Sequence, residues 1–242
     1  MNTFQTLIYE KKDSIAYITL NRPKALNVYN IQMRDELYQV LGAVRDDPDV
    51  AVAILKGAGD KAFCAGADLT EFLTAPSPII AHQVRWERDV WGLFLSLPQP
   101  VIAALHGYVL GDGIEMALCC DIRIASSDAQ FGAPEVGLGI IPAAGGTQTL
   151  PRMVGRSKAL EMLLTGRRLN AQEAYKAGLV NRVVPREELL PTTEEIARKI
   201  ASYSKMVVRI TKQATIRGLD LTLNEGLELE KRLETLNQVQ GF

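Results

Sequence analysis

The chain has 242 residues, 47% of them hydrophobic and 23% charged, the composition of a globular protein with a sizeable buried core. Its 27 Lys and Arg nearly cancel its 28 Asp and Glu, and the formal net charge of −1 argues against a nucleic-acid binder, which needs a basic surplus. Three cysteines are too few for a disulfide framework. The sequence has neither the apolar core of a signal peptide nor an apolar run of the roughly 20 residues that a membrane helix needs. We therefore expect a cytoplasmic protein without a membrane partner.

Strands and helices alternate in the predicted first half of the chain. Apolar residues recur three and four positions apart between Leu37 and Val44, which is typical of an amphipathic helix, and Asn30 is its expected N-cap. The run VAVAIL is apolar on both faces, as in a buried strand. The predicted elements are strands at residues 3–9, 15–20, 50–55 and 101–105 and helices at residues 31–45 and 79–97.

The second half continues this pattern and then becomes helical. Short helices are predicted at residues 113–120, 147–153, 157–165 and 171–177, strands at residues 122–125 and 180–184, and helices throughout the part that follows Pro191. Strands interleaved with helices predict an α/β core with crossover connections, followed by an α-helical appendage. The pattern does not give the number or the order of the strands.

Several common site types lack their sequence motif. His82 and His106 are the only histidines, and no G-x-S-x-G elbow accompanies them, which argues against a Ser/His/Asp hydrolase. Cys119 and Cys120 are adjacent on a predicted helix and therefore point about 100° apart, which favours buried thiols over metal ligands. Neither a phosphate-binding G-x-x-x-x-G-K loop nor a complete dinucleotide fingerprint is present. We therefore expect no metal site.

Two strand-to-helix turns share one design. KAFCAGADL, at residues 61–69, and GYVLGDGIEMALCCD, at residues 107–121, each place small residues between a strand and an apolar helical segment. Small residues allow a ligand close to the backbone, and the first N–H groups of a helix have no acceptor within it. Two such turns facing each other would direct two amide donors at one developing oxyanion. The alternative is ordinary turn chemistry.

Two glutamates accompany these turns. Glu115 lies in the first turn of an apolar helix, and Glu135 follows Pro134 in a glycine-rich stretch. Carboxylates among small apolar residues are desolvated, which raises their pKa toward the range of general acids and bases. The alternatives are a capping box formed by Asp112-x-x-Glu115 and a solvated loop carboxylate at Glu135. Spacing alone leaves these interpretations open.

At these segments the sequence closely resembles the crotonase superfamily, that is, the enoyl-CoA hydratase/isomerase family. The matching motifs cover roughly residues 4–190 in order, and they are NRPKALN, KAFCAGADL, GYVLGDGIEMALCCDIRIAS, FGAPEVGLGIIPAAGGTQTLPR and LLTGRRLNAQEAYKAGLVNRVV. The resemblance implies an α/β fold in which residues 1–190 form a crotonase-like spiral of ββα units, the catalytic core. It also implies that residues 191–242 form a helical region used in trimerisation, in a homotrimer or a dimer of trimers.

The resemblance also implies roles for individual residues. The backbone N–H groups of Ala67 and Asp112 are implied to form the oxyanion hole for an acyl-CoA thioester. Glu115 is implied to activate the water that adds to Cβ, and Glu135 to deliver a proton to Cα. A backbone amide at Ala143 is implied to help hold that water.

Further positions match the stretches that line the nucleotide and pantetheine arm in the family. These positions are Lys24, Ala25, Leu26, Lys61, Phe63, Ala65, Asp68 and Leu69. Lys24 or Lys61 would meet a phosphate of coenzyme A, although either is equally a candidate for a solvated surface charge. Part of residues 72–91 is expected to form the wall of the acyl pocket.

Both glutamates are present, and this favours an enoyl-CoA hydratase that needs no metal or redox cofactor, with coenzyme A only as part of the substrate. The alternatives are a Δ3,Δ2-enoyl-CoA isomerase that uses Glu135 alone and a non-catalytic relative that binds acyl-CoA or RNA. Two departures from the family pattern stand out. Many relatives have glycine where this chain has Asp112, whose side chain we expect to point out of the pocket because it would repel an oxyanion. The chain also stops at LNQVQGF, short of a terminal helical segment found in many relatives.

Overall fold

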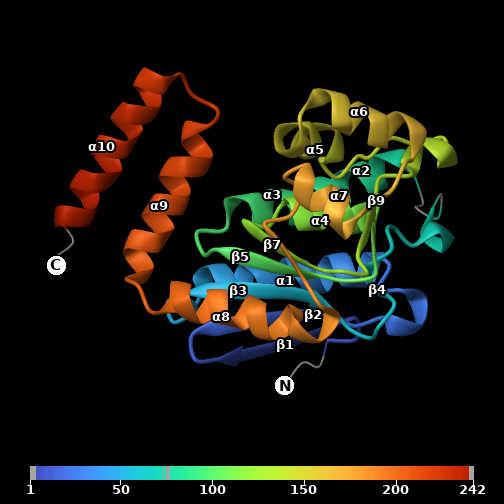
Figure 1. Ribbon diagram of the computed structural model, residues 1–242, viewed down its shortest axis with the longest axis horizontal. Coiled ribbons are helices and arrows are strands. Elements are labelled where there is room, and N and C mark those ends of the chain that lie inside the picture. Colours follow the sequence, from blue (N-terminus) through green and yellow to red (C-terminus); the bar gives the residue numbers. More distant parts are fainter. Residues whose placement is uncertain (1–3, 73, 75–76, 240–242) are drawn as a thin grey trace.

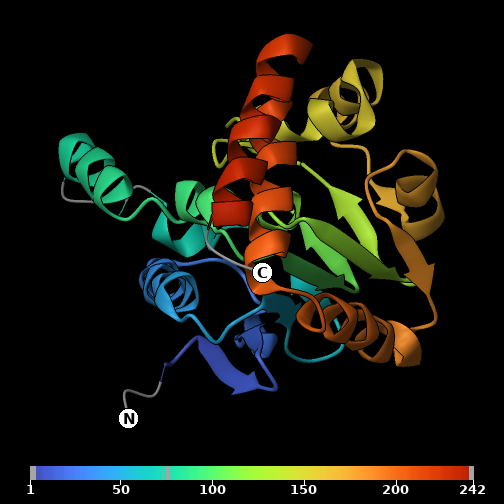
Figure 2. The ribbon, with the colours of Figure 1, turned by 90° about the vertical axis from the view of Figure 1, so that its left-hand side faces the viewer.

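The computed structural model describes residues 4–72, 74 and 77–239, and two sheets form its centre (Figures 1 and 2). Among the described residues, six strands form the larger sheet in the order β1-β2-β3-β5-β7-β10, and only β1 and β2 pair in the antiparallel sense. Its strands are β1 (Leu7–Lys12), β2 (Ile15–Leu20), β3 (Val52–Gly57), β5 (Val101–Leu105), β7 (Ile122–Ser126) and β10 (Arg182–Val184).

A smaller sheet lies beside the first. Its order is β4-β6-β8-β9, with strands β4 (Ala62–Cys64), β6 (Tyr108–Leu110), β8 (Gln130–Gly132) and β9 (Leu169–Asn170). The chain passes from β3 to β4, from β5 to β6 and from β7 to β8, so each passage takes it from the larger sheet to the smaller one. Helices follow each passage, and the chain thus winds as a spiral of ββα units. The sequence did not predict these strands, because two or three residues are too few to show an alternating pattern.

Helices cover the sheets and connect their strands. The α-helices are α1 (Ile31–Asp46), α2 (Pro78–Glu87), α3 (Val90–Ser96), α4 (Asp112–Leu118), α5 (Gly146–Val154), α6 (Arg156–Thr165), α7 (Ala171–Lys176), α8 (Leu189–Ala201), α9 (Lys205–Gly218) and α10 (Leu223–Val239). Short 3-10 helices are η1 (Pro23–Ala25), η2 (Leu69–Glu71), η3 (Glu135–Leu138) and η4 (Arg186–Glu188).

The larger sheet is buried on both faces because alternate residues of its strands pack in opposite directions. On one face, Ile54 and Ile102 pack with Leu189 and Ala197 of α8, which runs along this sheet in Figure 1. On the other face, Leu55 and its neighbours join the main core, to which α1, α3 and α4 contribute apolar side chains. The predicted boundary between residues 190 and 191 falls inside α8.

Several predicted elements are confirmed and others are corrected. The strands predicted at residues 15–20 and 101–105 have the predicted bounds, and Asn30 caps α1 by accepting a hydrogen bond from Met33 N at 2.9 Å. The strand predicted at residues 3–9 is wrong in its bounds, since β1 spans residues 7–12 and residue 3 lies outside the described part of the chain. The strand predicted at residues 50–55 is displaced by two residues, to 52–57.

The single helix predicted at residues 79–97 is two helices, α2 and α3. The break comes at Arg88, whose backbone leaves the helical region, and at Asp89, whose side chain caps α3 by accepting from Gly92 N at 2.9 Å. A local cap therefore overrides a continuous apolar pattern. In Figure 2, α2 projects from the body of the molecule. The helix α8 begins at Leu189, before Pro191. Pro191 is tolerated there because the N–H groups of the first turn form no hydrogen bonds within the helix.

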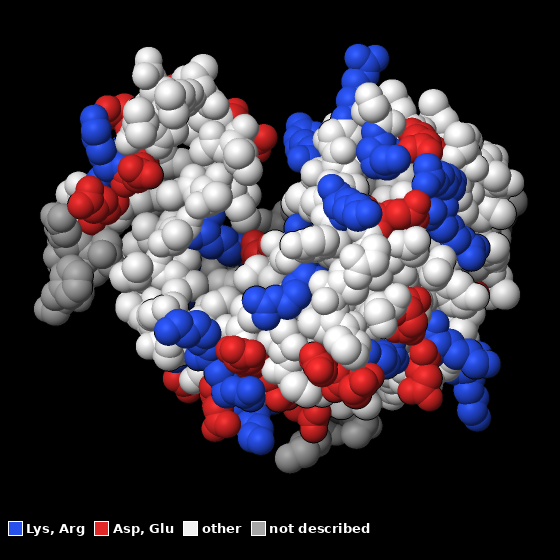
Figure 3. Space-filling view, viewed as in Figure 1, with Lys and Arg blue, Asp and Glu red and all other residues white. Residues whose placement is uncertain are grey.

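The helices α9 and α10 form an arm that stands away from the two sheets (Figure 1). Leu229 and Leu233 of α10 are buried within this chain, whereas Leu219 and Leu223, next to the turn of the arm, are 82% and 78% exposed. The side chain of Leu236 lies outside the described ones. Figure 3 shows a hollow between the arm and the rest of the molecule, and on the same face Lys and Arg are interspersed with Asp and Glu. No helix among the described residues combines the length and apolarity needed to cross a membrane.

Candidate active site

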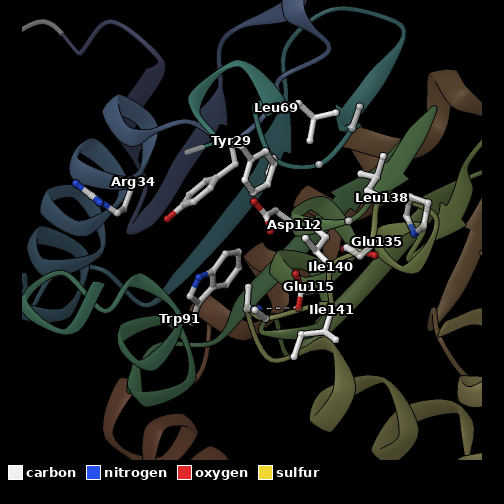
Figure 4. Close-up of a pocket in the computed structure, with 18 of the residues that line it drawn as sticks. Tyr29, Arg34, Leu69, Trp91, Asp112, Glu115, Glu135, Leu138, Ile140 and Ile141 are labelled. Carbon is white, nitrogen blue, oxygen red and sulfur yellow. Dashed lines mark hydrogen bonds between the residues drawn. The ribbon is translucent and has the colours of Figure 1, made fainter. Parts of the chain in front are cut away.

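A cavity of about 350 Å³ opens where the two predicted turns meet (Figure 4). The turn at residues 65–69 and the start of α4 form one side of it, and η3 with the loop at residues 140–144 forms another. Tyr29 and Trp91 close it next to α1 and α3, with ring centroids 5.5 Å apart. Ala65, Ala67, Leu69, Asp112, Glu115, Glu135 and Ala143 all lie in its lining, so the structure brings these predicted site residues together.

The two turns touch each other through glycines. A Cβ atom on Gly111 would lie 3.2 Å from the Cα atom of Gly66, and both glycines have positive φ, +53° at Gly111 and +114° at Gly66. A side chain at either position would be strained, and at Gly111 it would also push the turns apart. Glycine at these two places therefore permits the close approach.

Backbone hydrogen bonds hold the first turn without using the N–H group of Ala67. Tyr29 N donates to Gly66 O at 2.8 Å, and Asp68 N donates to Tyr29 O at 2.8 Å. Ala67 lies between these two bonded residues, and no acceptor for its N–H is found among the residues that the structure describes. Asp112 is the first residue of α4, so its N–H belongs to the amides at a helix N-terminus.

Glu115 is almost completely buried, with 1% of its surface exposed. Its Oε1 atom accepts hydrogen bonds from Ala144 N at 2.9 Å and from Gly146 N at 2.7 Å. The N-cap of α4 is Gly111, no side chain caps this end, and Glu115 N donates to Gly111 O at 3.1 Å, so the capping-box interpretation of Asp112-x-x-Glu115 is wrong. The pKa of Glu115 is raised to about 8: burial is the largest cause, the charges of Asp112 and Glu135 add to it, and the hydrogen bond from Gly146 N acts in the opposite direction.

Glu135, the first residue of η3, is 7% exposed, and the interpretation as a solvated loop carboxylate is therefore wrong. Neither of its carboxylate oxygens has a hydrogen-bond partner among the described residues. Burial raises its pKa. A Cβ atom on Gly111 would lie 3.2 Å from Glu135 Oε1, so this carboxyl group also faces the point where the turns meet.

The Asp112 side chain does not behave as expected. It lies in the cavity near Glu115 (Figure 4), and it raises the pKa of Glu115 both by charge and by a side-chain hydrogen bond. It does not cap α4 either, because the N-cap is Gly111 and no side chain caps this end. The expectation that the side chain points out of the pocket is therefore wrong. The partner of Asp112 inside the cavity is the Glu115 carboxyl group, with which its side chain forms a hydrogen bond.

A model of the family described as enoyl-CoA hydratase/isomerase matches residues 10–240. The chain belongs to this family. A crotonyl-CoA hydratase of Syntrophomonas wolfei subsp. wolfei is 43% identical to it over 228 residues, which make up 94% of this chain and 87% of that protein. A short-chain-enoyl-CoA hydratase of Clostridium acetobutylicum is 43% identical over 230 residues, or 93% of this chain and 86% of that protein.

Solved structures of family members have the same fold. The crystal structure of an enoyl-CoA hydratase from Bacillus anthracis superposes with a TM-score of 0.90 at 42% sequence identity, and the match covers 96% of this chain and 90% of that one. The resemblance to the crotonase superfamily is thus confirmed, and so is the α/β crotonase fold that it implied.

Not every predicted binding residue of this family member reaches the cavity. The residues outside its lining are Lys24, Ala25, Leu26, Lys61, Phe63 and Asp68. Lys24 and Lys61 are exposed, whereas the Phe63 side chain is buried in the main core. The Asp68 carboxylate lies 2.9 Å from Arg22 Nη2 and also caps η2.

These outlying stretches nevertheless adjoin the cavity through backbone contacts. Ala65 N donates to Leu26 O at 3.1 Å, which joins the first stretch to the cavity wall. The buried Asn27 side chain donates to Ala58 O at 2.9 Å and to Ala62 O at 2.8 Å. One amide side chain therefore holds residues 24–26 beside residues 61–63.

Sequence reasoning missed part of the lining. Phe72, Arg88 and Trp91 fall in the stretch expected to form the acyl-pocket wall, and all three line the cavity. Tyr29 and Arg34 were not predicted at all. The only signal in the sequence was their position after the NRPKALN motif: Tyr29 comes just before the helix that follows the motif, and Arg34 lies in that helix.

Replacing Gly111 by alanine should damage the site more than the fold. We expect Gly111→Ala to destabilise the protein by about 1 to 3 kcal/mol, because its φ of +53° disfavours any side chain. Turnover should fall by about a hundredfold, since the new methyl group separates the two turns and meets Glu135. Enzyme assays together with urea unfolding check both effects.

Gly155→Ala is the matched control for that change. Gly155 has a φ of +77°, lies between α5 and α6, and has no atom within 4 Å of the position of an added Cβ. It should therefore lose stability but keep turnover. Equal turnover losses in the two variants would contradict the close approach of the turns.

The stability of the protein should decrease as the pH rises toward 8. Burial raises the pKa of Glu115 from 4.5 to about 8, so the folded protein binds this proton more tightly than the unfolded chain does. The resulting stabilisation is complete below pH 4.5 and is lost as the pH rises through the folded pKa. Urea unfolding at several pH values should show this decline, and Glu115→Gln should reduce its slope. An unchanged slope in the variant would assign the decline to other groups.

Proposed function

We propose that this protein is an enoyl-CoA hydratase, a hydro-lyase that reversibly adds water in the syn sense across the 2,3 double bond of an enoyl-CoA thioester. The observation that carries the proposal is the presence of two buried glutamates in the lining of the cavity that opens where Gly66 meets Gly111, and burial raises the pKa of both. Similar proteins bear hydratase names, among them the crotonyl-CoA hydratase and the short-chain-enoyl-CoA hydratase.

In the proposed reaction, the thioester oxygen accepts hydrogen bonds from the N–H groups of Ala67 and Asp112. As water adds to Cβ, negative charge develops on this oxygen, and each preorganised donor stabilises it by about 3 to 4 kcal/mol. Both residues line the cavity, and Ala67 N–H has no competing acceptor among the described residues. The geometry of two touching glycine turns supports this role.

The proposed acid and base are Glu135 and Glu115. Glu115, held by Ala144 N and Gly146 N, accepts a proton from water, whose oxygen bonds to Cβ. Ala143, which lines the cavity next to these amides, helps to hold the water. Glu135 delivers a proton to Cα, so the elements of one water molecule are added and the reaction is redox-neutral. No metal or redox cofactor is needed for this chemistry, and coenzyme A remains part of the substrate.

We further propose that residues 24–26 and 61–63 lie along the nucleotide and pantetheine arm, together with Ala65, Asp68 and Leu69. The support is the position of Asn27, whose hydrogen bonds hold the two stretches side by side at the edge of the cavity. The exposed amines of Lys24 and Lys61 are then available for the phosphates. Phe63 contributes through its backbone, because its side chain belongs to the core.

The proposed assembly is a homotrimer or a dimer of trimers of a cytoplasmic protein, formed through residues 191–242. The arm of α9 and α10 supports this, because it exposes Leu219 and Leu223 away from the sheets. Large exposed apolar surfaces favour burial against another chain. Light scattering on the purified protein measures the number of subunits.

The function is tested by mixing the purified protein with but-2-enoyl-CoA. A hydratase abolishes the absorbance of the conjugated enoyl thioester and produces the 3-hydroxyacyl thioester, which mass spectrometry identifies. A panel of straight, branched and cyclic 2-enoyl thioesters then defines the range of substrates. Binding of acyl-CoA without any absorbance change would contradict the proposal and favour a non-catalytic relative.

A further inference from the structure

Three carboxyl groups of the described residues line the cavity, and two of them are bonded to each other. Asp112 and Glu115 come from the first turn of α4, and Glu135 begins η3. The Asp112 side chain forms a hydrogen bond with the Glu115 carboxyl group. An ionised carboxylate is only an acceptor, so two carboxyl groups form such a bond only when one of them carries a proton. Asp112 and Glu115 therefore share a proton.

The two oxygens of the Glu115 carboxyl group face different partners. Oε1 accepts hydrogen bonds from Ala144 N at 2.9 Å and from Gly146 N at 2.7 Å. A Cβ atom on Gly146 would lie 2.8 Å from Oε1, so glycine permits this close approach of the loop. Oε2 is then the oxygen left for Asp112, and in Figure 4 the Glu115 carboxyl group points toward Asp112 on the side away from its dashed hydrogen bond. The loop thus fixes Glu115 from one side and Asp112 binds it from the other.

The pair of Asp112 and Glu115 has few other charges around it. Burial raises the pKa of Cys64 and Cys119 to about 12 and raises the pKa of Tyr29 as well, so these groups stay neutral near neutral pH. Both cavity arginines form ion pairs with Asp35, at 2.8 and 3.1 Å. The titratable and charged groups around the pair among the described residues are Glu135 of η3, Tyr29 before α1, Cys64 of β4, Cys119 after α4, Arg34 of α1 and Arg88 after α2. Of these, only Glu135 changes charge in the range where the pair does.

Asp112 and the loop amides act on Glu115 in opposite directions. The hydrogen bond from Gly146 N favours the ionised form of Glu115 and lowers its pKa, which by itself would leave a well-held but weak base. Burial raises the pKa most, and the charge and the hydrogen bond of Asp112 raise it further, to about 8 in total. A general base is most effective when its pKa is near the operating pH. Asp112 therefore offsets the weakening that accompanies a fixed position.

We propose that Asp112 is a positioning residue, whose side chain binds the Glu115 carboxyl group inside the cavity and tunes it as the base that takes a proton from water. The inference rests on the proposed hydratase function. Once the shared proton has left the pair, an O–H bond of water breaks, the oxygen bonds to Cβ, and the proton goes to Glu115. The new O–H group of Glu115 donates to the Asp112 carboxylate, and such a bond to a charged acceptor is a strong one.

The test compares the wild type with Asp112→Asn, which keeps the size of the side chain and the backbone N–H but removes the charge. Infrared spectroscopy follows the C=O band of the protonated Glu115 carboxyl group, identified as the band that Glu115→Gln lacks. In the wild type this band should disappear with a midpoint near pH 8. In Asp112→Asn the midpoint should be lower by about one pH unit or more, because the neighbouring like charge is gone.

The same variant is then assayed with but-2-enoyl-CoA at about pH 9, where Glu115 is ionised in most molecules of both proteins. The kcat of Asp112→Asn should be about two- to tenfold lower than that of the wild type, because a weaker base takes a proton from water less readily. A merely structural role of Asp112 would lower kcat without moving the infrared midpoint.

Asp89→Asn is the matched control. Asp89 caps α3 by accepting from Gly92 N at 2.9 Å, and its charge reaches Cys119 at the end of α4, but it does not line the cavity. Asparagine is as good an N-cap as aspartate, so this variant loses a nearby charge and keeps its fold. Its infrared midpoint and its kcat should equal those of the wild type.

Two results would overturn the inference while leaving the hydratase function intact. The first is an infrared midpoint in Asp112→Asn that equals the wild-type midpoint, which would show that the two carboxyl groups do not interact. The second is a kcat in Asp112→Asn that is unchanged or higher, which would show that the charge of Asp112 does not serve the reaction. A wild type that hydrates no enoyl thioester would instead overturn the proposed function and with it the role of Asp112, whatever the infrared midpoints show.

Discussion

Glu115→Gln should reduce hydration of but-2-enoyl-CoA by about 10²- to 10⁴-fold, the contribution of a positioned general base. The glutamine keeps the carbonyl oxygen that accepts from Ala144 N and Gly146 N, so the loop at residues 144–146 stays in place. It cannot take a proton from water. The change therefore removes the chemistry and preserves the geometry, and a fall in kcat at nearly constant KM is the expected signature.

Glu36→Gln is the matched control, because Glu36 is also a buried glutamate but its pKa is lowered, not raised. Its carboxylate accepts from Gln5 N and Thr6 N, each at 2.8 Å, and it lies outside the cavity. Burial by itself would raise the pKa of Glu36, but the hydrogen bonds from Thr6, Gln5 and Gln32 outweigh burial, so the pKa is lowered. This variant should lose stability and retain kcat. If Glu115→Gln kept most of the activity instead, an isomerase that relies on Glu135 would be the better assignment.

The larger elements of the fold could be predicted from local patterns. The strand at residues 101–105 has an uninterrupted apolar run, and α1 has both an apolar stripe and a capping asparagine. The second sheet could not be predicted in this way, because β4, β6 and β8 have three residues each and are defined by their partners. A pairing between Phe131 and Leu169, for example, leaves no periodic trace in either segment.

The candidate site, too, could be predicted only in part from the sequence. Glu115 and Glu135 were visible because a carboxylate in an apolar or glycine-rich stretch is unusual, but spacing could not show whether Glu115 bonded back to its own helix. Its actual partners, Ala144 and Gly146, are about thirty residues away and depend on the tertiary fold. The side chain of Asp112 was misplaced because the burial of Glu115, the largest cause of its raised pKa, comes from the tertiary fold and cannot be read from the local sequence. The family resemblance indicated the site, and the three-dimensional contacts determined the state of its groups.

Glu135→Gln should also reduce turnover by about 10²- to 10⁴-fold, and it should make the protein more stable at alkaline pH. Neither oxygen of the Glu135 carboxyl group has a partner among the described residues, and burial raises its pKa. Its ionised form therefore weakens the folded state once the pH exceeds the folded pKa, and a neutral amide does not. The gain in unfolding free energy should increase with pH and should disappear in acid, where the carboxyl group is protonated.

The contrasting control for Glu135→Gln is Glu173→Gln. Glu173 forms a capping box with Asn170 at the start of α7: Asn170 N donates to the Glu173 carboxylate at 2.9 Å, and this bond is the main reason that the pKa of Glu173 is lowered. Replacing it should lower stability at neutral pH and leave turnover unchanged. Urea unfolding measures the change in unfolding free energy in each variant. A gain for Glu135→Gln and a loss for Glu173→Gln would show that the Glu135 carboxyl group is retained for chemistry at the expense of stability. A loss of stability in Glu135→Gln at alkaline pH, or retained turnover, would instead assign Glu135 a structural role.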